Sequence, residues 1–72
     1  MSQQDCDLAR LGLNVRRRCH VMRLTQKELA ERLGCSVQTI SRIEHGANIP
    51  VETVVRLSRA LEWTLPELLH GV

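Results

Sequence analysis

The sequence contains no phenylalanine and no tyrosine, and it has a single tryptophan, Trp63. Aliphatic side chains must therefore build any core. No apolar run approaches the roughly 20 residues that cross a membrane, and the N-terminal residues lack the basic and apolar regions of a signal peptide. These absences predict a cytoplasmic location and no membrane partner.

The three cysteines, Cys6, Cys19 and Cys35, are odd in number and show no Cys-x-x-Cys spacing. This pattern argues against a disulfide scaffold and fits a reducing compartment. Cys19 and His20 could belong to a metal site, but Cys19 falls on the apolar side of an expected helix, which favours packing. The sequence has no carboxylate pair, nucleophile–base set or glycine-rich phosphate loop. We therefore expect no enzyme activity, no catalytic residue, no metal ion and no cofactor.

Charge is distributed unevenly along the 72 residues. Residues 1–42 carry eight basic and four acidic side chains, residues 43–72 carry two and four, and the overall charge is +2. The run Arg16–Arg18 lies in the basic part. Such asymmetry favours binding of a polyanion to the basic side of the molecule and a different role for the other side.

Helical periodicity runs through the chain, and no segment alternates as a strand would. The helices are expected over about 7–22, 26–33, 37–45 and 50–61, with a short fifth helix after Thr64. Pro50 suits the first turn of the fourth helix, and Val51 is expected to contact the core. Residues 1–6 are expected to form a flexible tail. The prediction is an all-α domain of five short helices over residues 7–72, near the lower size limit for an unaided core.

The second and third helices carry the strongest local signal. Thr25 and Glu28 have the spacing of a capping box, and Gly34 suits the end of the same helix. Ser36 can cap the next helix only two residues later, so the two helices must cross at a steep angle.

The third helix has an apolar inner face and a polar outer face. Ile40 and Ile43 are expected to be buried, and Val37 partly buried. The polar residues that face outward are Gln38, Thr39, Ser41 and Arg42. A polar face on the second helix of a steep pair is typical of a helix that lies in the DNA major groove.

The sequence resembles the phage repressor/Cro-like helix-turn-helix family, also called the xenobiotic-response-element family. The residues that carry the likeness are Leu24–Gly34, Ser36, Ile40–Glu44, Gly46 and Glu52–Leu61. The resemblance covers about residues 8–70 and implies a lambda-repressor-like domain. It also implies DNA binding by a homodimer that is joined through the last helix.

The resemblance implies two sets of DNA contacts. Val37, Gln38, Ser41 and Arg42 would face base edges, where glutamine can bond adenine and arginine can bond guanine. Phosphate contacts would come from Gln26, Ser36, Thr39 and the main chain near Asn48, and the charge pattern adds Arg16 or Arg17. The plainer alternative is that the polar residues are a solvated surface and that Val37 completes the edge of the core.

The first helix departs from the family pattern at two places. Many members carry an arginine at the position of Cys19, and it pairs with the glutamate at the position of Glu44. Cys19 cannot make this pair, and Arg18 is the candidate to reach across in its place. Arg23 stands where glycine is frequent, so we expect a different bend after the first helix.

The apolar residues near the C-terminus, Trp63, Leu65, Leu68 and Leu69, lie outside the DNA-reading helix. We expect them to close the core of one chain, to form the homodimer interface, or to do both. Two copies would supply the affinity and the palindromic readout that one helix-turn-helix lacks.

The sequence therefore predicts a transcription regulator that binds double-stranded DNA at a palindromic operator as a homodimer, associated with the nucleoid. Three settings fit: a phage-like repressor, a restriction-modification controller, and a DNA-binding antitoxin that holds a toxin. RNA polymerase is a further candidate protein partner. The rival interpretation is a protein-interaction adaptor that has lost DNA binding, against which the polar helix face argues.

Overall fold

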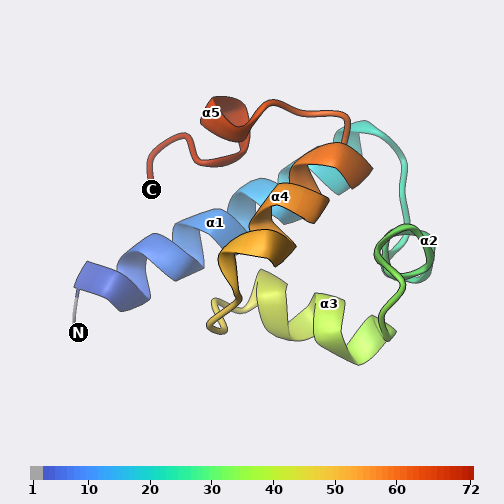
Figure 1. The fold of residues 1–72 in the computed structure, drawn as a ribbon, viewed down its shortest axis with the longest axis horizontal. Helices are drawn as coiled ribbons and strands as arrows, with labels where there is room; N and C mark the ends of the chain where they lie inside the picture. The colour runs from blue at the N-terminus through green and yellow to red at the C-terminus, as the bar shows by residue number, and fades with distance from the viewer. Residues whose placement is uncertain (1–2) are drawn as a thin grey trace.

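A computed structural model describes the backbone of residues 3–72 and the side chains of residues 7–72. Its helices are α1 (Gln3–Val21), α2 (Gln26–Leu33), α3 (Val37–Glu44), α4 (Val51–Ala60) and α5 (Leu65–Leu68), as Figure 1 shows. The predicted all-α fold of five helices is confirmed, and no strand occurs in the described part. Within that part, no helix is long and apolar enough to cross a membrane.

The helix boundaries differ from the prediction at two places. α1 begins at Gln3, so residues 3–6 are helical where a flexible tail was expected. Glutamine has a good helix propensity, and neither glycine nor proline interrupts these residues; Met1 and Ser2 lie outside the described residues. Pro50 has extended backbone and is the N-cap of α4 rather than part of its first turn. Val51 follows it at 80% exposure, so its expected contact with the core was wrong.

The core is aliphatic, as the near absence of aromatic residues requires. It consists of Leu11, Val15, Cys19, Leu29, Ala30, Leu33, Ile40, Ile43, Leu57, Leu61 and Leu68. The predicted burial of Ile40 and Ile43 is confirmed. All five helices or their caps contribute to this cluster, and α3 contributes Ile40 and Ile43 from its inner face.

The predicted capping signals position α2 and α3. The Thr25 hydroxyl accepts from the Glu28 backbone N–H at 3.0 Å, and the Glu28 carboxylate accepts from the Thr25 N–H at 3.0 Å. The bond from the Thr25 N–H holds the pKa of the Glu28 carboxyl below its ordinary value, because it stabilises the charged form. Gly34 ends α2 in the left-handed region at φ 71°, and the Ser36 hydroxyl accepts from the Thr39 N–H to begin α3.

Gly12 marks the closest approach between α1 and α3. A Cβ atom at this position would lie 2.5 Å from the carbonyl oxygen of Ile43 and 2.6 Å from that of Glu44. The sequence analysis missed this residue, although an isolated glycine inside a helical pattern is a signal of close packing. The backbone of α1 therefore touches the C-terminal end of α3 directly.

We predict that Gly12→Ala destabilises the protein, although alanine is the better helix former by about 1 kcal/mol. The new methyl group overlaps two backbone oxygens, which cannot move aside as a flexible side chain would. The free energy of unfolding should fall by about 2 kcal/mol, measured by urea denaturation. Arg16→Ala, an exposed change in the same helix, should stay within roughly 0.5 kcal/mol of the native chain. A Gly12→Ala protein as stable as the native one would contradict the close approach.

Arg23 makes the bend after α1 in a conformation that favours glycine. Its φ is 57°, and the Leu24 N–H donates to the Cys19 carbonyl at 2.8 Å to close the turn. Arg23 thus adopts the left-handed conformation that suits glycine, although it carries a side chain. A side chain there costs about 1–2 kcal/mol, because its Cβ crowds the following carbonyl.

We predict that Arg23→Gly raises the free energy of unfolding by about 0.5–1 kcal/mol. Glycine relieves the strain at this position, but it loses more conformational entropy on folding, so the net gain is smaller than the strain. Arg23→Ala is the matched control, because it removes the same charge but keeps the Cβ. Thermal denaturation at one salt concentration should show stabilisation in the glycine variant only. Equal shifts in both variants would assign the effect to charge instead.

Candidate nucleic-acid interface

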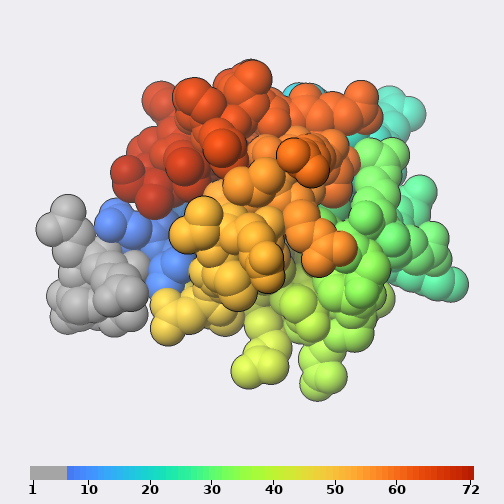
Figure 2. Space-filling model, in the orientation of Figure 1, coloured from blue at the N-terminus to red at the C-terminus, as the bar shows by residue number. Residues whose placement is uncertain are grey.

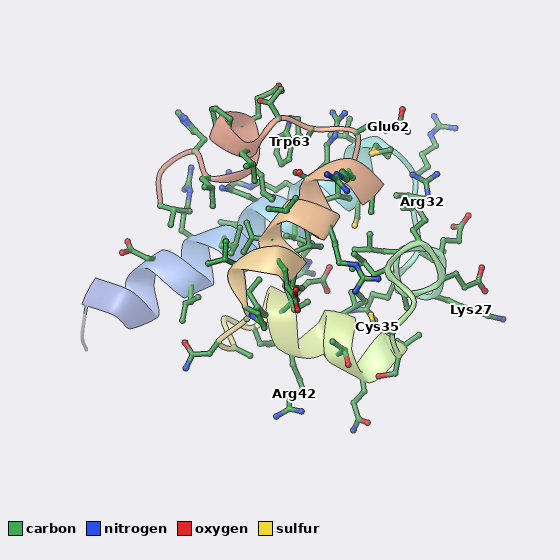
Figure 3. The ribbon with its side chains drawn as sticks, in the orientation of Figure 1. Lys27, Arg32, Cys35, Arg42, Glu62 and Trp63 are labelled. Carbon is green, nitrogen blue, oxygen red and sulfur yellow. The ribbon has the colours of Figure 1, made fainter. Side chains whose placement is uncertain are left out.

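The outer face of α3 projects from one edge of the molecule, on the side away from α5 (Figures 1 and 2). Gln38, Thr39 and Arg42 are exposed, and Ser41 is half-buried. Val37 is 42% exposed. Figure 3 shows the Arg42 side chain extending away from the helix into solvent. The structure thus places the four predicted base-contacting residues, Val37, Gln38, Ser41 and Arg42, along one face of α3, at spacings of one and four residues.

The N-terminus of α3 carries two hydroxyl groups side by side. The hydroxyls of Ser36 and Thr39 are 3.0 Å apart, and Ser36 also caps the helix. Both residues are exposed. A helix N-terminus with free N–H groups and adjacent hydroxyls suits a phosphate oxygen.

Gln26 and Glu44 connect the start of α2 with the end of α3. The Gln26 amide Nε2 donates to Glu44 Oε1 at 2.7 Å, so Gln26 replaces the missing arginine as the partner of Glu44. The expectation that Arg18 fills this role was wrong. An amide nitrogen carries two hydrogens, so Gln26 keeps one N–H for a second acceptor.

An open groove of about 690 Å³ runs beside this bond, between α1 and the helix-turn-helix. Its lining includes Arg16, Arg17, Gln26 and Glu44. Arg16 and Arg17 are exposed, and they lie on the same groove as the free face of the Gln26 amide. The structure therefore brings three of the predicted phosphate-contacting side chains to one place.

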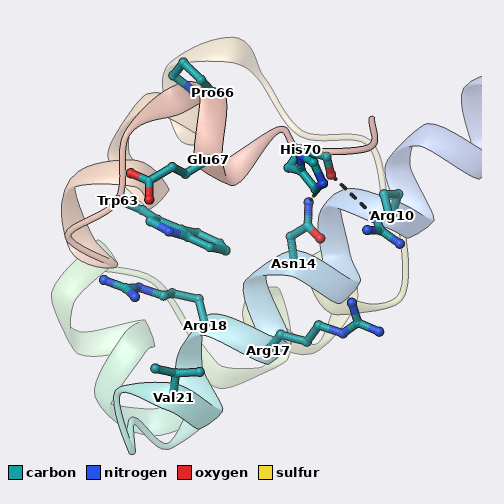
Figure 4. Close-up of a pocket in the computed structure, with 9 residues that line it drawn as sticks. All are labelled: Arg10, Asn14, Arg17, Arg18, Val21, Trp63, Pro66, Glu67 and His70. Carbon is teal, nitrogen blue, oxygen red and sulfur yellow. Dashed lines mark hydrogen bonds between the residues drawn. The ribbon is translucent and has the colours of Figure 1, made fainter.

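Arg18 points to the opposite side of α1. Its guanidinium donates to the carbonyl oxygens of Leu61 at 3.0 Å and Glu62 at 3.2 Å, and it lies 5.2 Å from the centre of the Trp63 ring (Figure 4). From α2, Arg32 donates to the Ala60 carbonyl at 2.8 Å. Two arginines therefore cap the C-terminal end of α4, where a helix has unpaired carbonyls and partial negative charge.

The loop after α3 brings Asn48 beside the reading helix. Gly46 takes φ 87° and packs against α1, where an added Cβ would lie 3.3 Å from Ala9 Cα. The Ala47 N–H then donates to the Arg42 carbonyl at 3.0 Å. Asn48 follows as an exposed residue next to the end of α3.

The predicted dimer residues divide into two groups. Leu65 and Leu69 are each 38% exposed and lie one helical turn apart. Leu68 is fully buried in its own chain, which removes it from the expected interface. Trp63 is half-buried and packs against Arg18. Apart from Val37, the other large apolar residues exposed in the described part are Leu13, Val21, Val51 and Val72, none of which the sequence analysis assigned to the interface.

Cys19 lies in the core, as its apolar position predicted. Burial, and next the nearby Glu44 carboxylate, raise the pKa of its thiol to about 11. A thiol with this pKa is almost entirely protonated near neutral pH, and the thiolate is the reactive form. Among the described residues, no group of three or more His, Cys, Asp or Glu side chains is placed to hold a metal ion.

Comparison with known protein families matches residues 22–68, from the last turn after α1 to α5, to the helix-turn-helix family. A solved structure, that of the restriction-modification controller protein C.AhdI from Aeromonas hydrophila, is similar at 25% sequence identity with a TM-score of 0.85. The similarity covers 93% of this chain and 99% of that one. Comparison with curated proteins found no match. The family match spans more than half of the chain, and its bounds contain both helices of the steep pair and the polar face of α3. The chain therefore belongs to the helix-turn-helix family of DNA-binding regulators.

Proposed function

We propose that the protein regulates transcription by binding a two-fold operator as a homodimer, with α3 in the major groove. The observation that carries this proposal is the outer face of α3. In the described part of the chain, the exposed side chains of Gln38 and Arg42 make no hydrogen bond within the protein, so folding does not use them. Their amide and guanidinium groups are those that bond adenine and guanine in two places each.

The proposed phosphate contacts surround this face. Arg16, Arg17 and the free N–H of Gln26 would meet one stretch of backbone, and Ser36 and Thr39 would meet phosphates at the N-terminus of α3. The main chain near Asn48 would approach the other strand. Such contacts orient α3 and make binding depend on salt, but they do not read sequence.

The proposed homodimer uses the apolar C-terminal surface. Leu65 and Leu69 expose side chains one helical turn apart there, and Val72 adds a third exposed apolar side chain near the C-terminus. Two copies related by a two-fold axis would place two α3 helices about one turn of DNA apart, which matches a palindromic operator. This surface contains none of the residues proposed to contact DNA.

Among the three genetic settings, the likeness to C.AhdI favours a restriction-modification controller. Occupancy of the operator would block or recruit RNA polymerase. An antitoxin role requires a second protein, and purification with a protein encoded beside this chain would support that role instead. The adaptor interpretation is weaker, because the polar face of α3 and the basic groove beside Gln26 are both intact.

Selection of bound sequences from a random duplex library tests the proposed function. The native chain should enrich a two-fold motif, and Gln38→Ala and Arg42→Ala should each relax one position of each half-site. Loss of a bidentate contact should weaken binding by about 1–3 kcal/mol, roughly 5- to 150-fold. Arg59→Ala is the control for charge, since this exposed arginine lies on α4, and it should keep the motif. No enrichment by the native chain at low salt would favour the adaptor.

The reactivity of the two cysteines in the described part tests the burial of Cys19. We predict that Cys35, which is partly exposed, reacts with iodoacetamide at pH 8, whereas Cys19 stays unmodified until the protein unfolds. The raised pKa keeps Cys19 protonated, so its reactivity should rise only as the pH approaches about 11. In a Cys6→Ser variant these are the two remaining cysteines, and mass spectrometry can identify which of them is alkylated. Rapid labelling of Cys19 in the folded protein would contradict its burial.

A further inference from the structure

Asn14 is a buried polar side chain that joins α1 to the C-terminal segment. We propose that it fixes the position of the dimer surface relative to α3, and thereby the spacing of the two half-sites that the dimer prefers. This inference rests on the proposed homodimer. It assigns Asn14 as a positioning residue, which touches neither DNA nor the second copy.

The contacts of Asn14 use the whole donor capacity of its amide. The side chain is 5% exposed, and Nδ2 donates to the carbonyl oxygens of Leu68 at 2.9 Å and His70 at 2.8 Å (Figure 4). These carbonyls lie at and just beyond the end of α5, where a helix leaves its acceptors unpaired. The other buried polar side chain in the described part, Ser58, bonds within its own helix. Asn14 is therefore the buried polar link between two distant segments.

The C-terminal segment needs such a link, because α5 is only four residues long. The buried Leu68 anchors it by hydrophobic contact, which has little directional preference. Two hydrogen bonds to carbonyls that are two residues apart select one rotation of the segment, and in that rotation Leu65 and Leu69 are partly exposed. Arg10 adds a longer contact from its Nε to the His70 carbonyl at 3.5 Å.

The same turn of α1 also holds the reading helix. Gly12, which touches the end of α3, precedes Asn14 by two residues, which places the two about 200° apart around the α1 axis. α3 and the C-terminal segment are thus fixed to opposite sides of one rigid helix. In a two-fold dimer, a change in the angle between them would alter the distance between the two α3 helices.

Asn14→Asp tests the inference with a change of nearly identical shape. The carboxylate has no hydrogen to donate and repels the two carbonyl oxygens. We expect the dissociation constant of the dimer, measured by analytical ultracentrifugation, to rise at least about tenfold. When both proteins select from duplexes with two half-sites at variable spacing, Asn14→Asp should enrich a wider range of spacings than the native chain does. Affinity for a duplex with one half-site should stay within twofold, because α3 is held by Gly12 and the core.

The pH dependence of Asn14→Asp separates positioning from general damage. A protonated carboxyl regains one donor, so dimerisation of this variant should recover relative to the native chain as the pH falls through the carboxyl pKa. Leu65→Ser, which alters the apolar surface directly, is the matched control and should weaken dimerisation at every pH. Unchanged dimerisation and spacing in Asn14→Asp would overturn the inference, and so would an equal loss of half-site affinity.

Two further outcomes separate a failure of the proposed homodimer from a failure of the role of Asn14. A native chain that stays monomeric and enriches no two-fold motif would refute the proposed homodimer, and the inference would fail with it. If Asn14→Asp does not fold, as judged by circular dichroism, Asn14→Ala at low temperature replaces it, because alanine introduces no repulsive charge. A dimer dissociation constant equal to that of the native chain in Asn14→Ala would then overturn the inference.

Discussion

The contact between Gly12 and the end of α3 is the constraint on which the rest of the structure depends. At this crossing, the backbone of α1 lies too close to the Ile43 and Glu44 carbonyls for any side chain to fit between them. α3 therefore cannot slide or rotate without a clash, and its buried isoleucines lock the same orientation from the inner face. The direction in which Gln38 and Arg42 point is consequently set by a residue that carries no side chain.

The arginine run on α1 shows how consecutive like charges take different roles. Successive helical residues point about 100° apart, so Arg16 lines the groove beside α2 and Arg18 turns to the C-terminal end of α4. Arg17 lies between them and lines both that groove and the pocket beside Trp63 (Figure 4). The absence of an arginine at position 19 is compensated locally. Gln26 satisfies Glu44 with a neutral donor, which leaves the Glu44 charge without a cation and contributes to the raised pKa of the neighbouring Cys19.

Local signals predicted the helices well, because their causes are local. The Thr25–Glu28 capping box, Gly34 and the Ser36 cap act over three or four residues and appear in the structure as the sequence indicated. The predictions failed where the partner lies far along the chain. Arg18 bonds residues more than forty positions away, and Asn14 bonds residues more than fifty away. A polar residue in a helical pattern does not reveal such a partner, and the exposure of Val51 and burial of Leu68 likewise depend on how α4 and α5 pack.

These observations show that α1 holds three other parts of the fold in place, which its sequence pattern alone did not predict. The helix contributes no residue to the outer face of α3, which is proposed to contact bases, yet it contacts α3, the C-terminal end of α4 and the C-terminal segment. Gly12, Asn14 and Arg18 lie within two turns of one another and contact these three parts in turn. Under the proposed function, a framework helix of this kind would allow the residues on the surface of α3 to change with the operator while the geometry of the proposed DNA-binding and dimer surfaces stays the same. The proposed recognition and dimer surfaces use different residues, and both are attached to α1.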